Sequence, residues 1–108
     1  MTIEELLSDA KELLDIRPDG WIVNRLHDAV KLAEETGEVA ECMTKSRKTI
    51  EDLGEELSDV IIVCAVIALR SGIDLTDACH KKQVKRVQKL VDRFHNGTYP
   101  SGVQRAKI

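Results

Sequence analysis

Two groups of acidic residues are the part of this sequence where chemistry is most concentrated. The first lies in the stretch KLAEETGEVAEC (31–42), where Glu34, Glu35, Glu38 and Glu41 stand within eight positions. On a helix, residues three or four apart share one side, so these like charges repel one another, whereas an ordinary exposed helix places acids opposite bases. We infer that a positive group must lie among them.

The second group lies in EELSDV (55–60), which supplies Glu56 and Asp59. These two acids are three residues apart and share one side of a helix, which apolar residues continue one turn later. If this helix packs antiparallel to a helix that carries Glu35 and Glu38, four carboxylates meet in one place. Buried anions cost several kcal/mol each unless something neutralises them.

Hard divalent cations are the natural counter-charge for such a cluster. Mg²⁺ prefers oxygen ligands and commonly bridges carboxylates to substrate phosphates, and Mn²⁺ accepts the same ligands. A di-iron carboxylate site is the main inorganic alternative, but it normally includes Glu-x-x-His motifs. No histidine of this chain follows a glutamate by three positions; the histidines are His27, His80 and His95. The residue types therefore favour Mg²⁺ or Mn²⁺.

The elements that must position these acids are all predicted to be helices. Helical periods of apolar residues run over 2–14, from Ile22 to about Lys45, from about Ile50 to Arg70, and from a cap at Asp74 or Thr76 to about Phe94. No strand pattern and no repeat of fixed period is present. We therefore predict an all-α, four-helix domain over residues 1–95 and an irregular tail over 96–108.

The apolar residues are spread too widely for one small domain to cover. The second predicted helix carries an apolar strip along Leu26 and Val30, and a second strip along Leu32 and Val39 lies roughly opposite. The third predicted helix is apolar all round after Asp59. Burying one Leu or Val side chain is worth roughly 1.5–3 kcal/mol. We therefore expect a homodimer or homotetramer whose second subunit completes the bundle.

Composition limits the classes of protein to which the chain can belong. Of 108 residues, 43% are apolar and 32% are charged, as in a soluble globular domain. The longest apolar run, 60–69, is too short to span a bilayer, and no stretch resembles a signal peptide. The three cysteines form no metal-binding or disulfide pattern, which indicates reduced thiols and a cytoplasmic protein; they are Cys42, Cys64 and Cys79.

The charges are divided unevenly along the chain. Residues 1–79 carry 18 acids and 8 bases, whereas residues 80–108 carry 8 bases and one acid, Asp92. Such a division indicates either a segment that binds nucleic acid or a basic element that faces an anion held by the acidic part.

Taken together, EETGEVAE (34–41) and EELSDVIIV (55–63) resemble the signature of the MazG-like nucleoside triphosphate pyrophosphohydrolases, an all-α family. That signature reads EExxE, a spacer and ExxD, and here seventeen residues separate the two parts. The resemblance extends from about Asn24 through GIDLTDA (72–78) into the fourth predicted helix. It implies a MazG-like bundle that cleaves (deoxy)nucleoside triphosphates between the α and β phosphates, releasing monophosphate and pyrophosphate, in control of the nucleotide pool.

The resemblance also implies roles for the acidic residues. Carried over position by position, it makes Glu35, Glu38, Glu56 and Asp59 the Mg²⁺ ligands, with Glu34 supporting them or the attacking water. Metal ions held there would polarise the phosphoryl oxygens, lower the pKa of a bound water and neutralise the pyrophosphate leaving group.

Basic residues should hold the remaining phosphate oxygens, which accounts for the uneven charge without nucleic acid. Lys31 lies on the acidic stripe one turn before Glu34, and the fourth predicted helix supplies Lys82, Lys85 and Arg86. Where the family often has a Lys followed four residues later by Asn, this chain has Lys82 and Arg86, and arginine is a capable phosphate ligand. The candidates for contacts with the base or sugar are Trp21, Asn24 and His27.

Two alternatives remain open. Phosphoribosyl-ATP pyrophosphohydrolase belongs to the same wider superfamily and has similar acidic helices. A non-catalytic helical dimer would instead bind nucleic acid through its basic last helix, with a steeply salt-dependent affinity, and would have no need of aligned carboxylates. The sequence also leaves open which base and which sugar are preferred.

Overall fold

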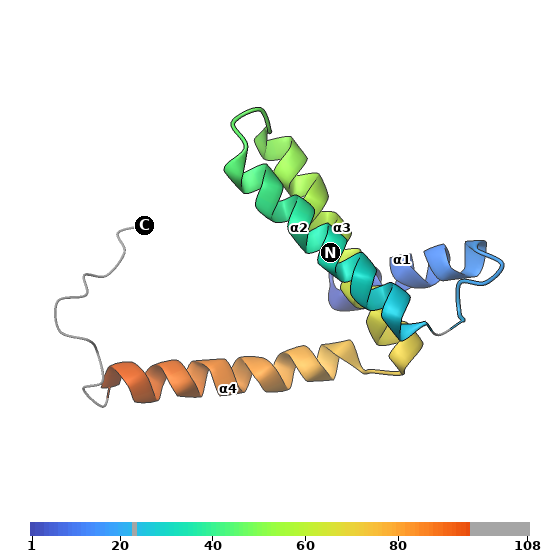
Figure 1. Ribbon diagram of the computed structural model, residues 1–108. Helices are drawn as coiled ribbons and strands as arrows, with labels where there is room; N and C mark the ends of the chain where they lie inside the picture. Colours follow the sequence, from blue (N-terminus) through green and yellow to red (C-terminus); the bar gives the residue numbers. More distant parts are fainter. Residues whose placement is uncertain (23, 96–108) are drawn as a thin grey trace. The chain divides into compact units, whose positions relative to one another are not determined.

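The computed structural model describes residues 1–22 and 24–95, which form helices joined by short turns, with no strand among them (Figure 1). The helices are α1 (Ile3–Ile16), α2 (Arg25–Thr44), α3 (Ile50–Ser71) and α4 (Leu75–His95). Residues 1–75 form one compact unit, and a second unit begins at Thr76. The all-α prediction is confirmed, whereas the predicted irregular tail over 96–108 lies outside the described residues.

α1 is fixed at its start by a capping box and along one side by packing. Thr2 Oγ1 accepts a hydrogen bond from the backbone N–H of Glu5 at 3.1 Å, and Glu5 Oε1 accepts one from the N–H of Thr2 at 3.3 Å. Ala10 and Leu14 are buried, and the helix packs against α3. The following turn passes so close to α1 that a Cβ placed on Gly20 would lie 2.1 Å from the carbonyl oxygen of Leu14. Position 20 therefore requires glycine, because there is no room for a Cβ atom beside the backbone of Leu14.

α2 begins three residues later than the apolar period predicts, at Arg25 instead of Ile22. Asn24 caps the helix, because its Oδ1 accepts a hydrogen bond from the backbone N–H of His27 at 3.0 Å. Ile22 lies in the preceding turn, where its N–H donates to the carbonyl oxygen of Asp19 at 3.0 Å. A local cap therefore decides the boundary, and the apolar period does not.

α3 has a strong signal at each end. At its start Thr49 and Asp52 form a second capping box, with side-chain to backbone distances of 3.1 and 2.9 Å. At its end Gly72 has a φ of 67°, in the left-handed region that favours glycine. The N–H of Ile73 then donates to the carbonyl oxygen of Ala68 at 2.9 Å. These signals agree with the bounds predicted from the sequence to within one residue.

α2 and α3 lie side by side as an antiparallel pair joined by the short loop 45–49 (Figure 1). Leu32 and Val39 of α2 are half-buried, whereas Leu26 and Val30 are 76% and 50% exposed. The strip of Leu32 and Val39 therefore faces the interior of the pair. The buried residues of α2 recur every seven positions on this side and are Asp28, Glu35 and Cys42.

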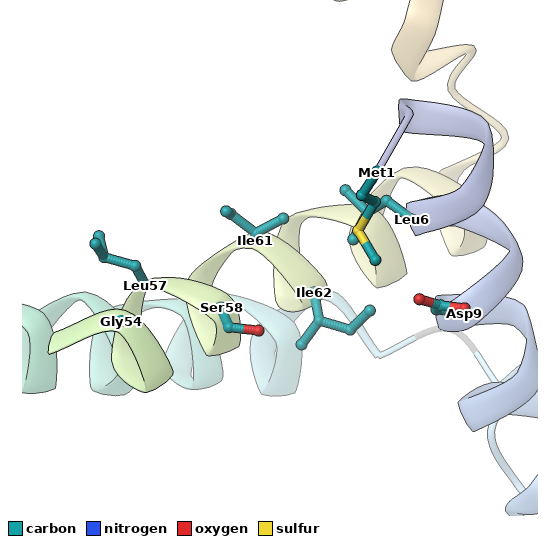
Figure 2. Close-up of a pocket in the computed structure, with 8 residues that line it drawn as sticks. All are labelled: Met1, Leu6, Asp9, Gly54, Leu57, Ser58, Ile61 and Ile62. Carbon is teal, nitrogen blue, oxygen red and sulfur yellow. The ribbon is translucent and has the colours of Figure 1, made fainter. Parts of the chain in front are cut away.

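An apolar groove of about 350 Å³ lies between the start of α1 and the middle of α3 (Figure 2). Met1 and Leu6 line one side, and Leu57 and Ile61 of α3 line the other. Leu57 and Ile61 are 46% and 49% exposed, so the expected burial of α3 on all sides does not occur within one chain. The buried residues of α3 are Ala65 and Ala68.

α4 is an amphipathic helix whose apolar side chains are exposed, among them Val84, Val87 and Val91. Its surface charges pair along the helix, as in the ion pair between Lys81 and Asp77 at 2.8 Å. No described helix, α4 included, is long and apolar enough to cross a membrane.

Candidate metal centre

Four carboxylates from α2 and α3 converge at one place. They belong to Glu35 and Glu38 of α2 and to Glu56 and Asp59 of α3, and one oxygen of each lies within 4.8 Å of the others. Within each helix the spacing of three residues sets both acids on one side. The antiparallel packing of α2 and α3 then brings the two pairs together, so the structure places these acids as the sequence analysis expects. We call these four residues the carboxylate cluster.

The carboxylate cluster is partly buried and its hydrogen bonding is incomplete. Glu35 is 6% exposed and Glu56 is half-buried. One oxygen of each, Glu35 Oε2 and Glu56 Oε2, is buried and has no hydrogen-bond partner among the described residues. A buried acceptor without a partner costs about 1–3 kcal/mol, and a charged one costs more. The cluster therefore needs a positive or hydrogen-bonding group beyond the side chains around it.

Lys31 supplies one positive charge to the cluster. Its Nζ lies 2.9 Å from Glu35 Oε1, one turn along α2, and this hydrogen bond raises the pKa of Lys31. Among the ion pairs of the described residues, this is the one that includes a member of the carboxylate cluster. One ammonium group thus faces four carboxylates.

Crowding of the carboxylates shows in the pKa of Glu38. A hydrogen bond with Glu56, followed by repulsion from Glu35 and Glu56, raises the pKa of Glu38 from 4.5 to about 7. A proton held between neighbouring carboxylates offsets part of the missing positive charge. A divalent cation would displace that proton, because carboxylates bind metals in the deprotonated form.

The residues present fit a hard divalent cation. All four members of the cluster offer carboxylate oxygens, which Mg²⁺ and Mn²⁺ prefer. Cys42 is buried on the same side of α2, but burial and then the charge of Glu56 raise the pKa of its thiol, and a protonated thiol is a poor ligand. His27 lies outside the cluster, with Nδ1 3.7 Å from Asp28 Oδ1. The donor set is therefore oxygen alone.

The other two glutamates of the stretch 31–42 lie outside the cluster. Glu34 is exposed, and its charge contributes to the raised pKa of Lys31. Glu41 accepts a hydrogen bond from Lys45 Nζ at 2.6 Å, one turn further along α2. The run of four glutamates thus divides into two cluster members, one flanking residue and one surface ion pair.

The three candidates for base or sugar contacts lie near the start of α2. Trp21 is 43% exposed, and its Nε1 donates to Asp15 Oδ1 at 2.7 Å. Asn24 uses its Oδ1 to cap α2, and His27 is exposed. Glu35 follows Asn24 by eleven residues, which is about 16 Å along the helix axis. Among the described residues, none of the polar contacts of these three side chains includes a member of the cluster.

The basic candidates of α4 belong to the second unit of the chain. Lys82, Lys85 and Arg86 are exposed, and Arg86 Nη1 donates to Gln83 Oε1 at 3.3 Å. Their contact with phosphate stays a prediction.

Asp28 and Arg70 form a buried ion pair that no motif of the sequence marks. Arg70 Nη1 donates to Asp28 Oδ1, and Arg70 Nε donates to the carbonyl oxygen of Gly20 at 2.8 Å. The two side chains are 12% and 8% exposed, respectively. Two signals were available in the sequence: Asp28 precedes Glu35 by seven positions, and Arg70 is the one lysine or arginine between Lys48 and Lys81.

Comparison with known families agrees with this geometry. The family model of the MazG nucleotide pyrophosphohydrolase domain matches residues 27–94, which is well over half of the chain and includes the whole carboxylate cluster. No curated protein and no solved structure gives a match. A match of this extent, over two helices whose acids converge, shows that the chain belongs to the MazG nucleotide pyrophosphohydrolase domain family.

Proposed function

We propose that this chain hydrolyses (deoxy)nucleoside triphosphates to monophosphate and pyrophosphate, in control of the nucleotide pool, and that it requires Mg²⁺ or Mn²⁺. The observation that carries the proposal is the pair of buried carboxylate oxygens, Glu35 Oε2 and Glu56 Oε2, that lack partners inside a cluster of four acids. The family of the chain supplies the reaction class, nucleotide pyrophosphohydrolysis.

Glu35, Glu38, Glu56 and Asp59 would hold the metal. A bound metal would polarise the phosphoryl oxygens and neutralise charge on the pyrophosphate leaving group. The chain itself holds these carboxylates in position on two packed helices before the substrate arrives. Such preorganisation supports a catalytic role better than a disordered acidic surface would.

The proposed reaction is attack of water on the α phosphate. The water oxygen bonds to the α phosphorus, the bond from that phosphorus to the α–β bridging oxygen breaks, and pyrophosphate leaves with the bonding electrons. The proton lost by the water passes to a carboxylate, for which the exposed Glu34 beside the cluster is our candidate. No glycine-rich phosphate loop of the GxxxxGK[ST] type, as used for γ-phosphate chemistry, occurs in the sequence.

Basic and aromatic residues complete the proposed site. Lys31 already lies beside Glu35 and can pass from that carboxylate to a phosphate oxygen once a metal neutralises the cluster. We assign the remaining phosphate contacts to α4 and the base or sugar contacts to the start of α2. The residues concerned are Lys82, Lys85, Arg86, Trp21, Asn24 and His27.

We also propose that the chain acts as a homodimer or homotetramer. Leu26, Val30, Leu57 and Ile61 are exposed in the single chain, and their burial against a second subunit would be favourable. All three cysteines are free thiols, in keeping with a cytoplasmic setting. Sedimentation at micromolar concentration should show at least a dimer, and a compact, stable monomer would contradict this part of the proposal.

Product analysis tests the reaction. The purified chain is incubated with each common nucleoside triphosphate and Mg²⁺, with and without added inorganic pyrophosphatase. We expect monophosphate and pyrophosphate, with orthophosphate released only when pyrophosphatase is present. Orthophosphate and a diphosphate product without pyrophosphatase would mean that a different bond is cleaved.

Two further arms of that experiment test the alternatives. Turnover of phosphoribosyl-ATP in preference to every nucleoside triphosphate would assign the chain to the related pyrophosphohydrolases. Absence of turnover on all of these, together with salt-dependent DNA binding, would favour the nucleic-acid-binding dimer.

A further inference from the structure

The carboxylate cluster depends on the register of two helices. Four carboxylate oxygens, one from each member of the cluster, lie within 4.8 Å of one another, and each helix of the α2–α3 pair supplies two of them. One turn of an α-helix rises about 5.4 Å. A slide of α2 along α3 by one turn would therefore separate the acids by more than the present span of the cluster.

The apolar contacts of Leu32 and Val39 and the ion pair within α2 do not specify this register. Leu32 and Val39 are aliphatic, and aliphatic side chains tolerate repacking against different neighbours. The ion pair of Lys31 with Glu35 joins two residues of α2, so it does not constrain the position of α3. The facing carboxylates repel one another when all of them are ionised, so in that state and without a cation they oppose the register that brings them together.

Asp28 and Arg70 supply the missing constraint. Among the described residues, theirs is the one ion pair that joins α2 to α3. The pair is directional and buried, and Arg70 also donates to the carbonyl oxygen of Gly20, in the turn between α1 and α2. Arg70 thus links α3 to α2 and to the turn before it.

We propose that the Asp28–Arg70 ion pair is a positioning device that sets the register of α2 on α3 and thereby holds the carboxylate cluster in its metal-binding arrangement. The proposal rests on the metal role of the cluster given under the proposed function. A buried ion pair often adds little net stability compared with apolar residues of similar volume, and its best-attested role is to specify register. Asp28 lies on the same side of α2 as Glu35 and precedes it by two turns, so a constraint at Asp28 acts directly on the cluster.

The test uses the double variant D28L/R70M in the full chain, because apolar residues of similar size should keep the fold while removing the directional contact. Helix register is read from dipolar broadening between nitroxide labels at Ala40→Cys and Glu51→Cys, with the three native cysteines replaced by alanine. Labelled protein is diluted with unlabelled protein so that only distances within one chain count. Mn²⁺ binding to the unlabelled variants is measured by titration calorimetry, without nucleotide.

We expect D28L/R70M to melt at or above the wild-type temperature, to show a changed or broadened label distance, and to bind Mn²⁺ about 10–100-fold more weakly, the range typical for residues that orient metal ligands. The conservative variant R70K keeps a cation opposite Asp28 and should retain most of the Mn²⁺ affinity. The matched control D77L/K81M introduces the same two residues, leucine and methionine, at an exposed ion pair of α4 and should leave both readouts unchanged.

A folded D28L/R70M variant with wild-type label distance and Mn²⁺ affinity would overturn the proposal. If D28L/R70M does not fold, D28N/R70M takes its place with the same expected and contrary results. Failure of the wild-type chain to bind Mn²⁺ would count against the proposed function, whereas the label distances would still decide whether the ion pair sets the register.

Discussion

The α2–α3 pair buries charged side chains in two places, and the two places differ in whether these side chains find partners within the chain. At one, Asp28 and Arg70 bring opposite charges together, and Arg70 finds a further acceptor in the carbonyl oxygen of Gly20. At the other, Glu35 and Glu56 each keep a buried oxygen without a partner among the described residues. Asp28 and Glu35 are seven residues apart on one side of α2, or about 10 Å along its axis.

This difference separates structural charge from functional charge. The Asp28–Arg70 site is completed by the chain itself, so removing one partner should mainly lower the stability, whereas replacing both partners with apolar residues should mainly alter the register. The carboxylate cluster lacks partners for two buried oxygens, and under our proposal a metal ion completes it, so altering the cluster should mainly lower the activity. Buried polar groups that lack partners are rare in native proteins, and a catalytic role or a bound ion is among the reasons for which they persist.

The largest expected effect is the loss of hydrolysis when the carboxylate cluster is altered. Glu38→Gln and Asp59→Asn should each lower turnover at least about 100-fold, because a metal contributes several kcal/mol to such transition states. Circular dichroism should show an unchanged helical signal. Glu41→Gln is the matched control, since Glu41 pairs with Lys45 outside the cluster and should be dispensable. Near-wild-type turnover in both cluster variants would mean that the carboxylate cluster has no functional role and does not differ from the Asp28–Arg70 pair in this respect.

Next in size is the loss of stability when the structural ion pair is broken from one side. Arg70→Ala leaves Asp28 charged and nearly buried without its partner, which should cost about 3–5 kcal/mol of unfolding free energy. Lys45→Ala breaks an ion pair that is 60% and 46% exposed and should cost no more than about 1 kcal/mol. Urea denaturation of both variants measures the contrast, and equal losses would show that Asp28 is better solvated than its burial indicates.

A smaller effect is expected where Arg70 meets the turn before α2. Gly20→Ala puts a Cβ 2.1 Å from the carbonyl oxygen of Leu14, and the required backbone shift should cost about 1–3 kcal/mol. Gly37→Ala meets nothing within 4 Å and should stabilise α2 by about 0.5–1 kcal/mol. Thermal melts of the two variants should therefore move in opposite directions. An unchanged melting temperature in Gly20→Ala would mean that the backbone of this turn can shift at little cost in stability.

The smallest effect concerns the pH dependence of the metal-free chain. The pKa of Glu38 is raised from 4.5 to about 7, so the folded chain binds this proton more tightly than the unfolded chain does. The resulting stability is fully present below pH 4.5 and is lost as the pH rises through about 7. The acids with lowered pKa titrate below this window and do not obscure it; they are Asp15, Glu41 and Asp52.

Denaturation of the chain in a chelating buffer from about pH 5 to about pH 8 measures this dependence. Stability should fall across the range in the wild type and stay level in Glu38→Gln. Glu38→Gln should also be the more stable of the two above pH 7, because it removes one repelling charge. Parallel curves for the two proteins would show that the proton is held elsewhere.

Much of the carboxylate cluster could be predicted from the sequence because its determinants are local. Spacing of three residues sets Glu35 with Glu38, and Glu56 with Asp59, on one side of each helix whatever the rest of the fold does. A short polar loop between the helices, 45–49, leaves antiparallel packing as the natural arrangement. The capping box at Thr2 is equally local, and it too lies where the sequence predicts it.

The sequence by itself determined four helices, the capping box at Thr2, the end of α3 at Gly72 and the two pairs of acids, because each depends on residues within one or two turns of one another. The tertiary structure alone decided which apolar strip of α2 faces α3, and that Arg70 reaches Asp28 across 42 positions of the chain. A helical period cannot choose between two apolar strips, since both repeat equally well. Nor can it pair a lone arginine with one acid among many, because that choice depends on which side chains meet when the helices pack.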